Sequence, residues 1–132
     1  MGLRPQPATL QALTVFVLID AGLRLFGFNR VYRWIVTAAA GRAPEEAPAE
    51  ARQRVVEAVN GATRLYYRRR RDCLPKALAT FFLLRRRRIP AALVLGVKKF
   101  PFAAHAWVES QGEVIDDVPE RVARYSVISR AS

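Results

Sequence analysis

The spacing of apolar residues changes once along this chain, near residue 90, and this change limits the possible folds more than any other feature. Before it, apolar residues recur every three or four positions, which predicts helices over residues 8–25, 29–40, about 47–67 and 73–86. After it, Leu- and Val-rich runs predict strands over 90–100, 102–110 and 112–118, the last two joined by a tight turn at 110–112. Several helices followed by a small antiparallel sheet predict an α+β fold.

The length of the chain predicts one compact domain. With 132 residues, 52% of them hydrophobic, the chain can bury a core of useful size. Within it, we expect a helical N-terminal portion, residues 1–66, and a portion of mixed helix and strand, residues 67–132, which carries the functional site.

Positive charge is concentrated in two arginine runs, residues 68–71 and 85–88, within a net charge of +11. Such charge predicts an anionic partner: an acidic peptide, an acidic protein face, nucleic acid or a membrane surface. A plain solvated surface is the alternative. Aromatic residues interleaved with basic ones are few and no known nucleic-acid-binding motif is present, so a basic nucleic-acid-binding module is kept only as a less favoured alternative function.

The N-terminal apolar segment, residues 10–23, is interrupted by Gln11, Thr14 and Asp20. The uninterrupted run is far shorter than the ~20 residues needed to span a bilayer. No secretory signal is recognisable. We interpret the segment as a buried helix, and contact of residues 10–26 with a partner or a membrane surface is the less favoured alternative.

The chain contains one cysteine and one histidine. A single cysteine excludes an internal disulfide and fits a reducing cytoplasm. A single histidine excludes a metal site that needs two imidazoles, and we expect neither a metal nor a cofactor.

Cys73 is predicted to begin a helix, with Asp72 as its N-cap and Pro75 in its first turn. The positive end of the helix dipole and the arginine run just before Cys73 would both favour the thiolate, which is the nucleophilic form. The alternative is that Cys73 is an inert core residue.

His105 lies in the predicted strand 102–110, with Trp107 on the same face of that strand. Folding the hairpin about the 110–112 turn brings both Asp116 and Asp117 near His105, and the spacing alone does not choose between them. A packed histidine and an acidic turn are the alternatives. A cysteine on a helix, a histidine on a strand and an aspartate on the next strand form the layout of papain-like and transglutaminase-like thiol enzymes.

The segment CLPKALATFFLLRRRRIPAALVLGVKKFPFAAHAWVESQGEVIDD resembles the C-terminal domain of lasso-peptide leader peptidases, the transglutaminase-like B proteins. The resemblance covers about residues 70–120 and includes "CL", "ALA", "LVLGV", "PFAAHAWVE" and the final Asp, in the family's order. It implies that Cys73 is the nucleophile, His105 the general base and Asp117 the orienting acid. Lys76 and Ala77 stand where family members usually have Arg and Ser.

The resemblance further implies an enzyme that removes the leader from a ribosomally made precursor peptide. It implies a site for the small β-branched side chain two residues before the core, and a partner cyclase of the asparagine-synthetase type. With a helical first third, the chain is expected to be the split form, in which a separate PqqD-like protein recognises the leader. A transglutaminase-like acyltransferase with the same three residues is the alternative reaction.

Three further positions are expected near the catalytic residues. The backbone N–H of Cys73 is a candidate oxyanion donor, and Tyr67, just upstream, is a second candidate. Trp107 and Asp116 are expected beside the site because of their places on the two predicted strands.

Overall fold

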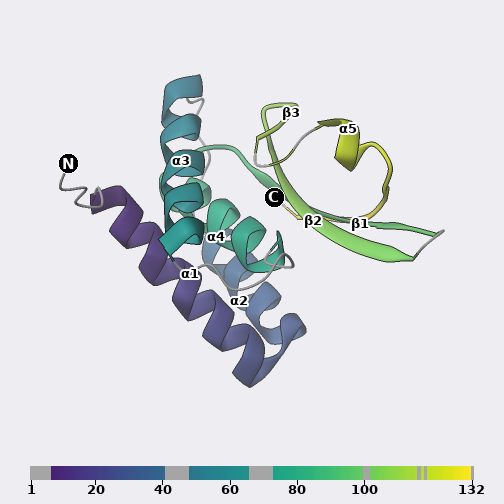
Figure 1. The fold of residues 1–132 in the computed structure, drawn as a ribbon, viewed down its shortest axis with the longest axis horizontal. Coiled ribbons are helices and arrows are strands. Elements are labelled where there is room, and N and C mark those ends of the chain that lie inside the picture. Colours follow the sequence, from purple (N-terminus) through teal and green to yellow (C-terminus); the bar gives the residue numbers. More distant parts are fainter. Residues whose placement is uncertain are drawn as a thin grey trace.

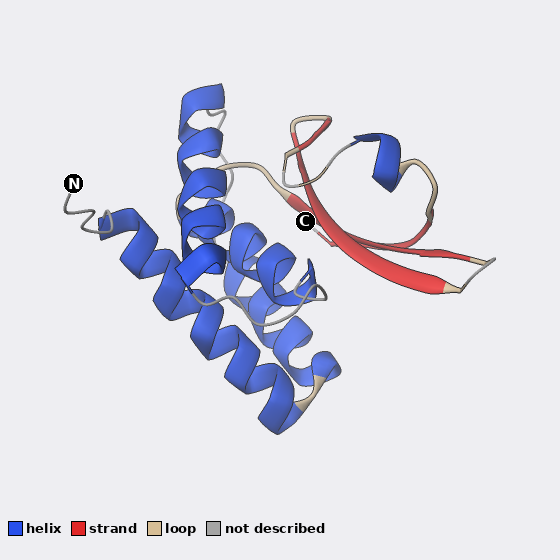
Figure 2. Ribbon diagram, viewed as in Figure 1, coloured by secondary structure: helices blue, strands red, loops and turns tan. Residues whose placement is uncertain are grey.

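In the computed structural model, which describes residues 7–40, 48–65, 73–99, 102–115, 117 and 119–131, four long helices lie on one side of an antiparallel sheet and a short helix lies on the other (Figure 1 and Figure 2). The helices in this part of the chain are α1 (Pro7–Phe26), α2 (Phe28–Ala40), α3 (Ala49–Leu65), α4 (Cys73–Arg86) and α5 (Pro119–Val122). The strands are β1 (Ala92–Lys98), β2 (Ala103–Ser110), β3 (Glu113–Val114) and β4 (Ser126–Ala131), in the spatial order β3-β2-β1-β4. The predicted α+β class is confirmed.

Two of the helices end for identifiable reasons. Gly27, with a φ of +85°, separates α1 from α2. At the end of α4, Arg88 has a φ of +61°, while Ile89 N–H donates to Leu84 O and Arg88 N–H donates to Arg85 O. These two bonds form a Schellman motif. The second arginine run therefore ends a helix, where positive charge is favourable to the helix dipole.

Helix α4 lies between the other helices and the sheet, since it contacts α1, α2 and α3 as well as β1 and β2 (Figure 1). Most of its apolar side chains are almost fully buried, and so are several that α1 and α3 contribute to the same core. The largest of these are Phe16, Val55, Val59, Leu78, Phe81, Leu83 and Leu84. The main core is therefore built around the helix that begins at the single cysteine.

The sheet has two covered faces, and side chains alternate between them along each strand. Leu93, Ala106 and Val108 belong to the main core with α4. Val94 and Trp107 form a smaller cluster with Val122 of α5 on the opposite face. His105 lies two residues before Trp107 on β2, so its side chain is on the α5 side of the sheet.

The hairpin between β2 and β3 keeps the predicted register for its first pairs. Ser110 pairs with Glu113, Glu109 pairs with Val114, and Ile115 N–H donates to Val108 O. Gln111 and Gly112 both have positive φ, as a type I′ turn requires. The strand predicted over 112–118 was too long, because β3 ends at Val114 and the chain bends away before Pro119 begins α5.

The C-terminal tail, for which the sequence predicted no element, forms α5 and the edge strand β4. Strand β4 pairs with β1 with an irregularity between Leu95 and Gly96. Among the helices in the described ranges, none combines the length and the apolarity needed to cross a lipid bilayer.

Candidate active site

Helix α4 begins at Cys73, as the sequence predicts, and Pro75 is buried in its first turn. The side chain of Cys73 lies outside the described part of the structure, as do Tyr67, Asp72 and Asp116. The structure therefore fixes where the backbone of Cys73 lies, at the positive end of a 14-residue helix.

The side chains of His105 and Asp117 are in direct contact. His105 Nε2 shares a short hydrogen bond with Asp117 Oδ2, and the two side chains are only 12% and 9% exposed. Asp117 reaches the imidazole from the bend that follows β3, and not from a paired strand position. The carboxylate thus accepts a hydrogen bond from Nε2. Nδ1 is then the ring nitrogen that can exchange a proton with another group.

Two aromatic rings flank the imidazole. The ring centroid of His105 lies 5.9 Å from that of Trp107 and 5.2 Å from that of Tyr125, each at an interplanar angle of 30°. Trp107 was expected beside the site from its place on the strand. Tyr125 was missed, because it lies in the tail and its approach depends on α5 folding back over the sheet.

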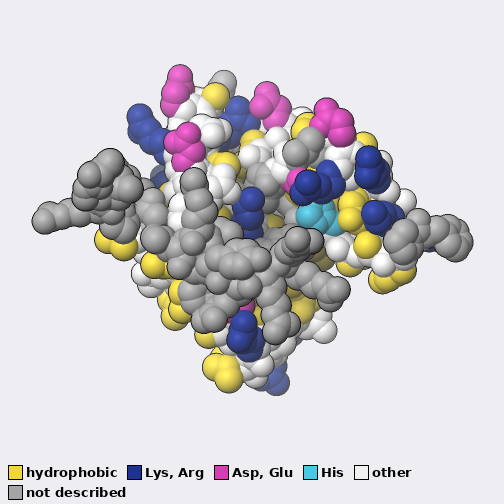
Figure 3. Space-filling model, in the orientation of Figure 1, with side chains coloured by type: hydrophobic (Ala, Val, Ile, Leu, Met, Phe, Trp, Pro, Cys, Tyr) yellow, Lys and Arg dark blue, Asp and Glu magenta, His cyan; other side chains and the backbone are white. Residues whose placement is uncertain are grey.

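Two cations extend this cluster. Arg121 Nη1 lies 3.3 Å from Asp117 Oδ1, and Lys98 Nζ lies 5.3 Å from the centroid of the Tyr125 ring. Figure 3 shows the histidine at the surface with basic side chains beside it. Arg121 was also missed from the sequence, although its spacing of four residues from Asp117 on a helical turn is the signal that could have identified it.

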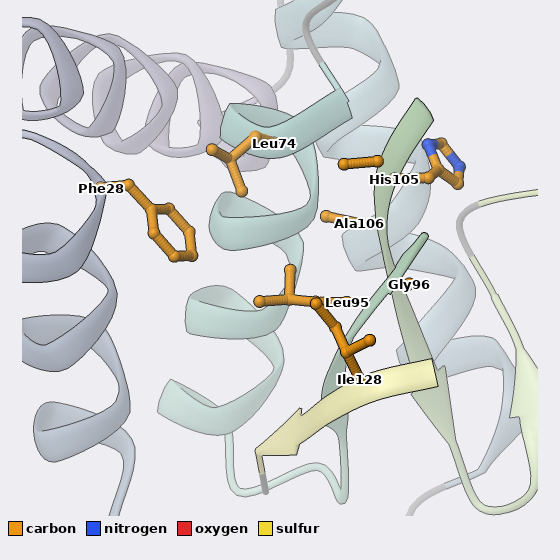
Figure 4. A pocket seen from close by; sticks show the side chains of 8 residues that line it. Phe28, Leu74, Leu95, Gly96, His105, Ala106 and Ile128 are labelled. Carbon is orange, nitrogen blue, oxygen red and sulfur yellow. The ribbon is translucent and has the colours of Figure 1, made fainter. Parts of the chain in front are cut away.

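A cavity of about 310 Å³ separates the first turn of α4 from the beginning of β2. Leu74, the residue after Cys73, lines it together with Phe28, Leu95, Ala104 and His105 (Figure 4). Figure 4 also shows the imidazole of His105 pointing away from Leu74, to the other side of β2. The start of α4 and the start of β2 therefore border one cavity, while the imidazole faces Asp117.

Glu109 holds the indole of Trp107. Trp107 Nε1–H donates to Glu109 Oε2 at 3.0 Å, and Arg130 of β4 pairs with Glu109 Oε1. Burial by itself would raise the pKa of this carboxyl, but the hydrogen bonds from Trp107 and Arg130 and the charge of Arg130 together hold the pKa of Glu109 below its ordinary value of 4.5. Glu109 is therefore anionic near neutral pH and fixes the tryptophan that packs on His105.

Within the described residues, no group of three or more His, Cys, Asp or Glu side chains is placed to hold a metal ion. The chemistry that this arrangement can support is acid–base chemistry at His105, with Asp117 holding the tautomer and orientation of the ring. Such a pair activates a nucleophile when one lies within reach of Nδ1.

Comparison with known proteins gives two matches. The sequence model of the transglutaminase-like superfamily matches residues 15–130, which span both the helices and the sheet. The chain is also 45% identical over 58 residues to the microcin J25-processing protein McjB of Escherichia coli. These residues make up 44% of this chain and only 28% of that relative. No solved structure matches the chain.

Proposed function

This chain belongs to the transglutaminase-like superfamily, and from that premise we propose that it is a cysteine peptidase that removes the leader from a lasso-peptide precursor. The observation that carries the proposal is the contact of Asp117 with His105, which lies on a strand packed beside the helix that begins at the only cysteine. Similarity to a protein named for processing microcin J25 supports a peptide precursor as the substrate.

In the proposed reaction, the thiolate of Cys73 attacks the carbonyl carbon of the scissile peptide bond. The tetrahedral intermediate collapses to a thioester as His105 donates a proton to the departing amine, which becomes the new N-terminus of the core peptide. A water molecule, deprotonated by His105, then attacks the thioester. The leader leaves with a free carboxyl group and the thiol of Cys73 is restored.

The proposal assigns a separate role to each side chain. Asp117 holds Nε2 of His105, so Nδ1 is the atom that exchanges the proton with sulfur. The proposal therefore requires the sulfur of Cys73 to come within reach of Nδ1. Leu74, next to Cys73, and His105 border one cavity, but the imidazole points to the other side of β2, so the loss of cleavage in both Cys73→Ala and His105→Ala is what tests that the two groups act together. The backbone N–H of Cys73, at the helix start, is the proposed oxyanion donor, and Tyr67 remains a candidate for a second.

The partners are also part of the proposal. We assign leader recognition to a separate PqqD-like protein and closure of the macrolactam to an asparagine-synthetase-like cyclase. Residues 67–132 would carry the catalytic groups and residues 1–66 would support them. A single thiol kept in its reactive form fits a reducing compartment such as the cytoplasm.

The experiment that tests this proposal mixes the full chain with a lasso precursor peptide, with and without the PqqD-like protein of the same biosynthetic cluster, and reads the products by mass. We expect one cut that separates leader from core and that disappears in Cys73→Ala and in His105→Ala. A product in which an amine has replaced water would identify an acyltransferase. Full cleavage by Cys73→Ala would exclude both reactions.

A further inference from the structure

The segment from Arg121 to Tyr125 covers the side of the sheet on which His105 and Asp117 meet. We propose that Tyr125 and Arg121 are positioning residues for this pair, an inference that rests on the proposed role of His105 as the base. Neither residue is expected to touch the substrate. Both act through the two side chains that they hold.

Arg121 contacts the carboxylate oxygen of Asp117 that His105 does not contact. Asp117 Oδ2 contacts His105 Nε2, while Asp117 Oδ1 lies 3.3 Å from Arg121 Nη1. A carboxylate held at both oxygens cannot rotate without breaking one of the two contacts. Val122, the next residue, is 8% exposed and packs on Val94 and Trp107, which fixes the helix that carries Arg121 to the sheet.

Tyr125 holds the imidazole itself. Its ring stacks on His105, and the centroids of Trp107 and Tyr125 are 6.2 Å apart, so that the three rings contact one another. The two larger rings restrict rotation of the imidazole and reduce the access of water to its bond with Asp117. A hydrogen bond in such a site is stronger than one in water.

The position of Tyr125 is itself fixed from several directions. Its N–H donates to Val122 O at 3.0 Å, and Lys98 Nζ lies over its ring. A Cβ built on Gly96 would come within 3.0 Å of Tyr125 Cβ, so the tyrosine sits directly against the backbone of β1. A ring held this firmly can restrain the imidazole that it contacts.

The test uses the fact that His105 is the only histidine. The full chain therefore gives one set of imidazole ring-proton resonances in an NMR spectrum, without any substrate. Tyr125→Leu keeps an apolar side chain but removes the ring, and we expect the His105 resonances to move downfield as shielding from the stacked ring is lost. Tyr125→Phe keeps the ring and is expected to leave the resonances in place.

The same variants are then assayed for precursor cleavage. We expect Tyr125→Leu to lower kcat by about 10- to 100-fold with little change in KM, since a small misplacement of a catalytic group has effects of this order. Tyr125→Phe is expected to restore kcat. An unchanged kcat in Tyr125→Leu would overturn the positioning role of Tyr125, whatever happens to the resonances.

Arg121→Gln has Arg124→Gln as its matched control, because Arg124 is exposed three residues further along the same segment. Arg121 is 62% exposed, so we expect a decrease in kcat of about two- to fivefold, the range of an exposed ion pair, and no decrease in the control. Equal effects of the two substitutions would overturn the role of Arg121. Cleavage that survives His105→Ala would instead reject the proposed function. Failure of the positioning role and failure of the proposed function therefore give different results.

Discussion

The backbone of Gly96 lies directly beneath the indole of Trp107, so that a Cβ built on residue 96 would stand 2.7 Å from Trp107 Cη2 and 2.9 Å from Cζ3. Trp107 is 1% exposed and cannot move away without displacing the cluster that includes Val94 and Val122. Only a glycine allows the indole to cross β1 at this point.

Gly96→Ala is therefore expected to destabilise the fold by about 1–3 kcal/mol, the usual cost of overpacking a filled core. The free energy of unfolding, measured by urea denaturation, checks this. Ala104→Ser, at an exposed position on the neighbouring strand, is the control and is expected to stay within about 0.5 kcal/mol of wild type. If Gly96→Ala were as stable as the control, the close contact with Trp107 would be wrong.

Asp117 and Asp116 are neighbours in sequence and are predicted to differ in function. Asp117→Ala removes the carboxylate that holds His105, and we expect cleavage to fall by roughly 100-fold or more. Asp116→Ala is expected to have a much smaller effect. Initial rates of precursor cleavage compare the two variants, and a larger loss in Asp116→Ala would contradict the assignment.

The carboxylate of Glu109 is predicted to stabilise the fold only in its ionised form. Its pKa is held below 4.5 in the folded chain, so its contribution is present above about pH 4.5 and is lost as the pH falls through the folded pKa. Glu109→Gln should therefore be less stable than wild type near neutral pH, and the difference should shrink in acid.

Urea denaturation of both proteins at several pH values measures that difference. Glu120→Gln, at an exposed position in α5, is the control for losing one acidic side chain. A stability difference between Glu109→Gln and wild type that stays constant with pH would show that the ionised carboxylate is not what Trp107 and Arg130 stabilise.

Arg52 of α3 anchors the hairpin that leads to Asp117. Its Nη1–H donates to Ser110 O at 2.9 Å and its Nη2 lies 3.7 Å from Glu113, while its side chain is only 12% exposed. Arg52→Gln should cost about 1–3 kcal/mol, because the buried carbonyl of Ser110 loses a charged donor. Thermal unfolding compares it with Arg54→Gln, an exposed position on the same helix, and equal melting temperatures would count against the anchor.

The sequence was sufficient to predict the four long helices and the hairpin of β2 and β3. Apolar residues at helical spacing placed the beginnings of α1 and α2 within one residue and both bounds of α4 where the structure has them. The hairpin register followed from Gln111 and Gly112, because a two-residue turn leaves no freedom in the pairing. These features depend on local spacing and turn chemistry, which a sequence displays directly.

The rest depends on tertiary contacts. The sequence predicted that both aspartates lie near His105. The contact is made by Asp117 because β3 ends at Val114 and the chain bends back after it. Tyr125 had no periodic signal, since α5 has only four residues and gains its position from Val122 on the sheet, and the only signal for Arg121 was its four-residue spacing from Asp117. Short elements held by packing are the ones that periodicity does not predict.

Helix α4 contacts three other helices and two strands, so the main core cannot open without loosening it. Its amide protons beyond the first turn should therefore be among the last to exchange with deuterated solvent, at a free energy close to that of global unfolding. A reactive group at the start of this helix would be attached to the most slowly exchanging segment of the molecule. Any motion that turnover requires would then have to come from the loops and side chains around that group.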